Sequence, residues 1–134
     1  MRVDIEIITE KTGSPMSIGT GHARITLHCV CNGEDKAQKK ELHQENVTRN
    51  EFALSTCICA MKELVYPCEV HISVNNPYVT ASSERIKEWH DNDWKRSGGK
   101  PVKNLKLWQQ LYMLMEIHNV TFEKLEVEHE NKND

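Results

Sequence analysis

Three features that would place this chain in a special class are missing from its sequence. No apolar run approaches the roughly 18 residues of a membrane-spanning helix, so no membrane association is expected. The first six residues alternate polar and apolar side chains and form no signal-peptide core. The cysteines are odd in number and lack the spacing of a disulfide framework, which predicts reduced thiols and a cytoplasmic location. They are Cys29, Cys31, Cys57, Cys59 and Cys68.

The composition is otherwise that of an ordinary globular domain. The 134 residues are 38% hydrophobic and 28% charged, which suits a single domain over residues 1–134 with one core. Two C-x-C pairs, Cys29/Cys31 and Cys57/Cys59, are a weak metal-binding pattern. A simpler explanation is that the cysteines serve as small apolar side chains, one pair on a strand and the other on a helix.

Charge is distributed unevenly along the chain. The formal net charge is −3, so the protein as a whole is not basic enough to indicate a nucleic-acid partner. Residues 94–106 nevertheless carry five cations and no acid, whereas residues 123–134 carry five acids and two lysines. This distribution predicts a local basic patch on an acidic body. The five cations are Lys95, Arg96, Lys100, Lys103 and Lys106.

Hydrophobic periodicity predicts three strands, a helix, a strand, helices and a last strand. Alternation over residues 3–7 and 23–27 predicts two strands, and Asn32-Gly33 predicts a hairpin turn to a polar edge strand at about 39–44. Helical spacing predicts a helix at 54–65, capped by Thr48 or Asn50, and another at 105–115. A buried strand at 69–74, a helix at 83–94 and a strand at 120–125 complete the order. It predicts a mixed sheet with helices on its faces.

Several motifs taken together resemble those of type 1 ribonuclease H. The most specific is Lys100-Pro-Val-Lys-Asn104 followed by Leu107-Trp108. The segment 75–79, Asn-Asn-Pro-Tyr-Val, follows a strand as Asp-Ser-x-Tyr-Val does in that family. The segment 48–54 is similar to the start of the family's first long helix, and two tryptophans precede the lysine-rich motif as in the bacterial subgroup. The resemblance extends over nearly the whole chain.

The resemblance implies an α/β, ribonuclease H-like fold: a mixed five-stranded sheet with helices on both faces. In that family the last strand leads into a loop with a histidine, a fourth carboxylate and a final helix. Here the chain reaches His129 and stops at Asp134. We therefore expect the C-terminal helix to be missing, and Asp134 to stand near the fourth carboxylate only if the loop is shortened.

The resemblance also implies a catalytic centre that has lost its metal ligands. Members of the family cleave the RNA strand of RNA–DNA hybrids with two Mg²⁺ ions held by carboxylates. The corresponding positions are Glu10, Ala53 and Asn75, which are a longer acid, a side chain without oxygen and a neutral amide. Lys11 replaces a glycine and adds positive charge, and Glu51 lies about 200° from Ala53 around the helix. We expect no intact catalytic residue, no metal and no cofactor, with Mg²⁺ or Mn²⁺ needed only for residual nuclease activity.

A nucleic-acid-binding surface is implied by the same correspondence, centred on the protrusion from Trp89 to Asn104. Simpler interpretations stay open, because the tryptophans can simply pack, the cations can belong to a solvated loop, and Asn50 can serve only as a helix cap. His71 and His118 are interpreted as ordinary structural histidines. The predicted binding residues are Asn50, Trp89, Trp94, Lys95, Arg96, Lys100, Lys103 and Asn104.

Three functions are compatible with these observations. The first is a ribonuclease H-like protein without catalysis that binds RNA–DNA hybrid or double-stranded RNA through shape and phosphate contacts. The second is a protein-interaction or structural module, in which a partner protein or a second copy covers the exposed sheet. The third is a residual metal-dependent hybrid nuclease that uses Glu10 with Asp4, Glu6 or Asp134. We favour the first.

Overall fold

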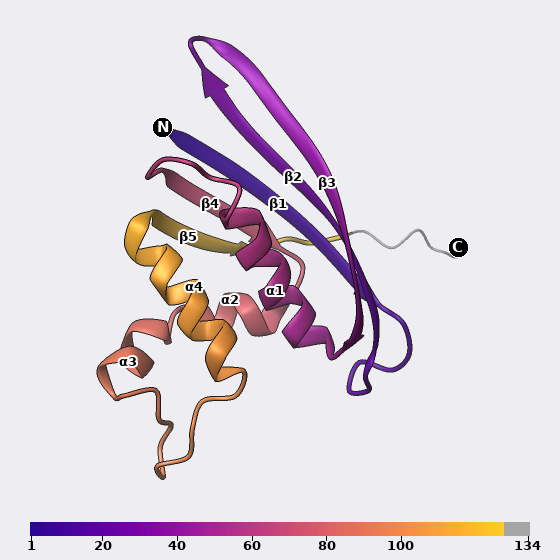
Figure 1. Ribbon diagram of the computed structural model, residues 1–134, viewed down its shortest axis with the longest axis vertical. Coiled ribbons are helices and arrows are strands. Elements are labelled where there is room, and N and C mark those ends of the chain that lie inside the picture. Colours follow the sequence, from indigo (N-terminus) through magenta and orange to yellow (C-terminus); the bar gives the residue numbers. More distant parts are fainter. Residues whose placement is uncertain (128–134) are drawn as a thin grey trace.

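A five-stranded sheet forms one layer of the computed structural model, which describes residues 1–127, and the helices lie on one side of it (Figure 1). Its strands are β1 (Arg2–Lys11), β2 (Gly19–Cys31), β3 (Glu34–Val47), β4 (Glu69–Val74) and β5 (Asn119–Lys124). Their order across the sheet is β3-β2-β1-β4-β5. β2 is antiparallel to β1 and β3, whereas β4 is parallel to β1 and β5. The mixed five-stranded sheet predicted from the sequence is therefore confirmed.

The connection from β3 to β4 carries the first of the four helices in residues 1–127, and the start of this helix is fixed by a capping box. The Thr48 hydroxyl accepts a hydrogen bond from the Glu51 backbone N–H at 3.2 Å, and the Glu51 carboxylate accepts one from the Thr48 N–H at 2.9 Å. Of the two predicted caps, Thr48 is the one used. The helices are α1 (Arg49–Met61), α2 (Pro77–Ser83), α3 (Ile86–Asp91) and α4 (Leu105–Ile117).

The hydrophobic core lies between the helices and one face of the sheet. Along β1, Ile5 and Ile7 are at most 1% exposed, while Glu6 between them points to the opposite face and is exposed. From α4, Trp108 and Leu111 are fully buried in the same core. In residues 1–127 the helices thus bury their apolar side chains against a single face, and the opposite face presents polar side chains. Within this part of the chain the helices cover one face of the sheet, rather than both faces as the resemblance implied.

A glycine in β2 sets how closely α1 approaches the sheet. A Cβ atom on Gly21 would lie 2.5 Å from the ring of Phe52, which is 1% exposed. The ring therefore packs directly on the backbone of β2, in a small cluster that includes Ala23 and Val47. This contact holds the N-terminal turn of α1 against the end of the sheet that carries Glu10 and Lys11.

The edge strand is longer than predicted. The sequence indicated only residues 39–44, whereas β3 runs from Glu34 to Val47 and pairs with β2 along almost its whole length. The turn that joins them contains Asn32 and Gly33, with φ values of 55° and 78°, as expected for a two-residue hairpin. Pairing with β2, rather than an apolar pattern of its own, fixes the length of this polar strand.

The helix predicted over residues 83–94 is replaced by α2 and α3. The side chain of Asn76 accepts a hydrogen bond from the Val79 N–H at 3.0 Å, and Pro77 occupies the first helical position, so a helix begins before the predicted start. α3 ends before Asp93 and Trp94, whose φ values of 58° and 62° are left-handed.

The remaining elements are all present, but α1 ends at Met61 rather than at residue 65, and the first two strands extend beyond the predicted 3–7 and 23–27. β4 has the predicted bounds, α4 extends to Ile117, and β5 ends at Lys124, one residue before Leu125. None of the four helices described for residues 1–127 combines the length and apolarity of a membrane span. The prediction that the C-terminal helix is missing falls on residues 128–134, outside the described part of the chain.

Candidate functional site

The carboxyl ends of β1 and β4 lie side by side, because the two strands are parallel and paired up to Ile7 and Val74. Asn75 follows directly on β4. Its amide oxygen accepts hydrogen bonds from the Thr9 backbone N–H at 2.9 Å and the Thr9 hydroxyl at 3.0 Å, and its amide nitrogen donates to the Thr9 carbonyl at 2.9 Å. The side chain of Asn75 thus extends the pairing between these two strands.

These contacts decide what Asn75 offers to a cation. A carbonyl oxygen has two lone pairs, and both are directed at donors of Thr9. The amide is neutral, so it contributes no charge to offset a divalent ion. The Asn75 amide oxygen is therefore already fully hydrogen-bonded to Thr9, and a metal ion would have to displace one of these hydrogen bonds to bind it.

The first turns of α1 offer no replacement ligand at this place. Ala53 is fully buried in the core. The Glu51 carboxylate is held in the capping box of its own helix. Asn50 accepts a hydrogen bond from the Asn76 side chain at 3.1 Å, and Asn76 is only 2% exposed. Asn50 therefore ties α1 to the start of α2, a structural role beyond the simple cap that the sequence left open.

Glu10 and Lys11 lie at the end of β1 and face different surroundings. The Glu10 carboxylate is 79% exposed and lies 3.6 Å from Nδ1 of His22, its cross-strand neighbour. The Lys11 ammonium donates to the carbonyls of Thr12 at 2.7 Å and Ser14 at 2.9 Å. The positive charge of Lys11 is thus held by the loop that follows β1.

The described donor set does not fit two Mg²⁺ ions. Mg²⁺ requires oxygen ligands in near-octahedral geometry. Of the three corresponding positions only Glu10 supplies a carboxylate, and its contact is with His22 rather than with Asn75. His129 and Asp134, the candidates for the loop histidine and the fourth carboxylate, lie outside the described residues.

Aromatic stacking holds the segment after α2 against α4. The ring of Trp89 meets that of Trp108 edge-on at 5.5 Å between centroids, and Trp94 meets Tyr112 in the same manner at 5.8 Å. His90 stacks on Tyr112 at 4.4 Å. Both tryptophans therefore pack, as the simpler interpretation allowed. Their packing also fixes the position of the basic loop that follows them.

The basic loop is a short hairpin that projects away from the sheet (Figure 1). Lys95 and Pro101 form an isolated antiparallel bridge, and the Arg96 N–H donates to the Lys100 carbonyl at 2.7 Å. Gly98 and Gly99, with φ values of 89° and 83°, close the turn.

An open cleft of about 770 Å³ lies along this hairpin. Arg85, which directly precedes α3, adds a fourth cation to its wall, and Glu88 is the one acid among the described residues that line it. None of the four cations that line the cleft, nor Lys103 or Lys106, lies within ion-pair distance of a carboxylate in residues 1–127. The cleft is lined by Arg85, Glu88, Trp89, Asn92, Lys95, Arg96, Ser97, Gly98 and Lys100.

Asn104 and Lys103 have different surroundings. The Asn104 side chain donates to the Tyr78 hydroxyl at 3.2 Å, and the Trp108 indole donates to the same oxygen at 3.0 Å. Asn104 is thus an anchor at the start of α4, with a left-handed φ of 57°. Lys103 is exposed, as a phosphate-contacting residue must be.

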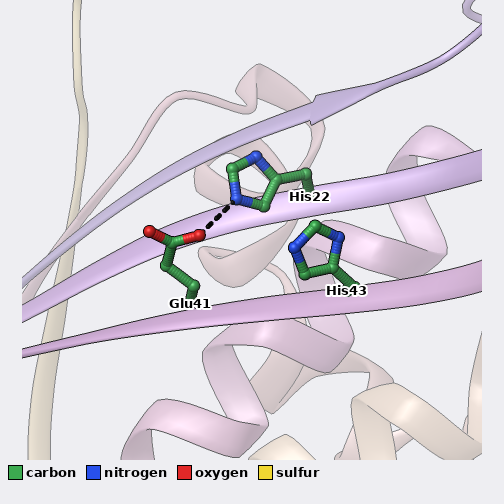
Figure 2. A group of neighbouring side chains, drawn as sticks. All are labelled: His22, Glu41 and His43. Atoms are coloured by element: carbon green, nitrogen blue, oxygen red, sulfur yellow. Dashed lines mark hydrogen bonds and ion pairs between the residues drawn. The ribbon is translucent and has the colours of Figure 1, made fainter.

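A cluster that the sequence patterns did not reveal lies on the open face of the sheet, where His22, Glu41 and His43 come together (Figure 2). Nε2 of His22 lies 2.9 Å from a Glu41 oxygen. This hydrogen bond raises the pKa of His22 and lowers the pKa of Glu41, as expected for a charged pair. Only the register between β2 and β3 brings the three residues together, so no local sequence motif predicts this cluster.

Comparisons with known proteins identify relatives of this chain. A family model described as RNase H matches residues 13–133. Ribonuclease H of Caldicellulosiruptor saccharolyticus is 37% identical over 84 residues, which are 61% of this chain and 58% of that protein. Ribonuclease H of Chlorobium phaeobacteroides strain BS1 is 33% identical over 98 residues, 70% of this chain and 67% of that protein. The chain thus spans less than two thirds of the length of the first of these relatives.

Solved structures are similar in fold. LC9-RNase H1, described as a type 1 RNase H with the type 2 active-site motif, superposes with a TM-score of 0.76 at 20% identity, over 92% of this chain and 62% of that one. LC11-RNase H1, solved in complex with RNA/DNA hybrid, gives a TM-score of 0.61 at 14% identity, over 90% and 84%. At such identities the likeness shows the arrangement of the sheet and helices.

Proposed function

The chain belongs to the RNase H family, and from that premise we propose that it binds RNA–DNA hybrid or double-stranded RNA through its basic hairpin without cleaving it by two-metal hydrolysis. The observation that carries this proposal is the contrast between two regions. The hairpin keeps its cations exposed and unpaired within residues 1–127, whereas the strand-end position next to β1 holds an amide engaged with Thr9.

Support for binding comes from charge and position. The cations at 95, 96, 100, 103 and 106 lie on a segment that Trp89 and Trp94 hold against α4, so fixing the backbone of this segment costs little further entropy on binding. Lys and Arg neutralise phosphates and release counterions. LC11-RNase H1, a structural neighbour, was solved with a hybrid, and the same substrate class suits this hairpin.

Support for the loss of hydrolysis comes from the ligand count. Two Mg²⁺ ions need several carboxylates, and Ala53 and Asn75 provide none. Correctly placed acid–base groups alone contribute about 10²–10⁴ in rate, and missing metal ligands should cost at least as much. Little hydrolysis of a bound hybrid is therefore expected.

Binding across salt concentrations tests the proposal. Fluorescence anisotropy with hybrid, double-stranded RNA and duplex DNA of equal length should give log–log salt slopes of about −4 to −5 for the hybrid if all five cations contact phosphates. Hybrid and double-stranded RNA should bind more tightly than duplex DNA, because A-form geometry is what shape recognition reads. No binding at low salt, or a flat salt response, would reject the proposal.

Residual nuclease activity is the second candidate, and one finding favours it: the curated relatives are named Ribonuclease H. Glu10 keeps an exposed carboxylate at the end of β1 and would be its main ligand. Incubating a labelled hybrid with Mg²⁺ or Mn²⁺ decides the matter. Cleavage that disappears in Glu10→Gln but persists in Glu34→Gln, an exposed acid at the start of β3 outside the candidate ligands, would replace the first proposal with this one. A protein-interaction role stays a prediction.

A further inference from the structure

The open face of the sheet carries a row of histidines and acids across three strands. His22 of β2 lies directly opposite Glu10 of β1 on one side and His43 of β3 on the other. Glu41 lies two residues before His43 on β3, so both project to the same face. Two neighbouring strands therefore present two imidazoles and a carboxylate within one small area.

The geometry points to a binding site for one divalent transition-metal ion of the zinc class, held by His22, Glu41 and His43. One ligand atom from each of the three lies within 4.8 Å of the other two. His22 Nε2 and a Glu41 oxygen are 2.9 Å apart, and the imidazole rings of His22 and His43 stack with centroids 4.4 Å apart (Figure 2).

The donor set selects the class of ion. Neutral imidazole nitrogens and a carboxylate suit Zn²⁺, Co²⁺, Ni²⁺ or Cu²⁺, whereas Mg²⁺ prefers oxygen ligands alone. Zn²⁺ with ligands at about 2.0–2.1 Å has tetrahedral edges of roughly 3.3 Å, so the three ligand atoms are near but not at their bound positions. His43 and Glu41 are exposed and have the freedom to rotate until their lone pairs converge. Water would complete the coordination.

Glu10 supplies a further element of such a site. Its carboxylate lies 3.6 Å from Nδ1 of His22, while Nε2 of the same ring faces Glu41. Metal-bound histidines commonly donate their other ring N–H to a carboxylate, which fixes the ring's orientation. Glu10 would therefore act as a positioning residue for His22, a role in which its exposed carboxylate needs no contact with Ala53 or Asn75.

The ion site is independent of nucleic-acid binding. Its ligands lie on β2 and β3, and none of them lines the cleft of the basic hairpin, which is formed by residues 85–100. Loss of hybrid binding would therefore leave this inference standing, and loss of metal binding would leave the proposed function standing.

Calorimetric titration of the metal-free, reduced protein with ZnCl₂ tests the inference. We expect one ion per chain in the wild type, and Glu41→Gln and His43→Gln should each lower the affinity at least about tenfold, because even the partners behind metal ligands are worth 10- to 100-fold. Glu10→Gln should give a smaller loss. Titration with Co²⁺ provides a second measurement, since nitrogen and oxygen ligands give visible bands without the thiolate charge-transfer absorption that cysteine ligation would add.

His71→Gln is the matched control. His71 lies on the same face and is hydrogen-bonded to Glu123 at 2.7 Å and to Thr121 at 2.9 Å, but it belongs to no three-ligand group within residues 1–127. Its removal should leave the affinity unchanged. Three outcomes would overturn the assignment: no stoichiometric binding by the wild type, wild-type affinity in Glu41→Gln and His43→Gln, or a thiolate band in the Co²⁺ spectrum.

Discussion

Asn75 and Thr9 are joined by three hydrogen bonds that continue the pairing of β1 and β4 past the last residues of their ladder. The Asn75 backbone N–H adds a fourth link, to the Ile7 carbonyl at 3.3 Å. An amide both donates and accepts, whereas an ionised carboxylate only accepts. Asn75, which the sequence resemblance assigns to the family's strand-end acid position, is therefore suited to extending the pairing of β1 and β4.

Asn75→Asp should destabilise the metal-free protein. The substitution removes the donor to the Thr9 carbonyl and sets a carboxylate oxygen against it, which we expect to lower the free energy of unfolding by about 1–3 kcal/mol at pH 7. Urea denaturation measures this. Thr9→Val, which removes only the hydroxyl donor, should cost about 1 kcal/mol. An Asn75→Asp variant as stable as the wild type would show that the amide contacts contribute nothing.

Restoring two acids should create metal affinity. In Ala53→Glu/Asn75→Asp, two carboxylates are placed at the positions where the sequence resemblance puts the family's acids. Ala53 is fully buried, so the new glutamate destabilises the metal-free protein by several kcal/mol unless it is neutralised. Mn²⁺ should reverse part of this loss, by about 2.7 kcal/mol at a concentration 100 times the Kd.

Thermal denaturation with and without Mn²⁺ is the measurement for this pair of substitutions, and Ala53→Gln/Asn75→Asp is the control that lacks one charge. An equal response to Mn²⁺ in the two double variants would mean that the residue correspondence with the family is wrong at position 53. The ion site proposed at His22, Glu41 and His43 would also bind added Mn²⁺. Both double variants are therefore compared in a His43→Gln background, which removes that contribution.

The sequence predicted those elements whose own side chains determine them. β1, β2 and β4 alternate because one face is buried, and α4 repeats its apolar residues at helical spacing because it packs on the core. β3 has no such pattern, because its extended conformation is fixed by hydrogen bonds to β2 rather than by burial of its own side chains. α2 was missed because a helix of seven residues has too few apolar positions to show a period, and only Asn76 and Pro77 mark its start.

The site was predictable to the extent that local motifs carry it. The assignment of Ala53 and Asn75 to the family's acid positions came from matching short segments and stays a prediction, whereas the exposed cations of the hairpin were found by counting charge. The hydrogen bonds of Asn75 to Thr9 and the group of His22, Glu41 and His43 depend on strand register. Residues 19 or more positions apart in sequence meet in both cases, so no window along the chain contains them.

Cys57 should be chemically inert in the folded protein. Burial raises the pKa of its thiol from 9.0 to about 12, because the thiolate is poorly solvated in the core. Iodoacetamide at pH 8 should therefore modify the half-buried Cys59 and spare Cys57 until urea unfolds the chain, as mass spectrometry of peptides would show. Equal modification of both thiols in the native protein would contradict the packing of α1.

The same shift gives a direction for stability against pH. A thiol whose pKa is higher in the folded than in the unfolded state contributes fully below pH 9, and this contribution is lost as the pH rises toward 12. Cys57→Ala should therefore weaken the decline of stability between pH 9 and pH 11. A decline of the same steepness in the variant would assign the effect to other groups.

Arg85 gives the sharpest test of the cleft as a phosphate path, because only the fold brings it to the basic hairpin. If the cleft holds the nucleic-acid backbone, Arg85→Gln and Lys100→Gln should each reduce the log–log salt slope for hybrid binding by about one. Lys62→Gln, at the exposed end of α1, should leave it unchanged. A slope that falls with Lys100→Gln but not with Arg85→Gln would confine binding to the tip of the hairpin, and a slope that falls equally in all three variants would indicate attraction to net charge alone.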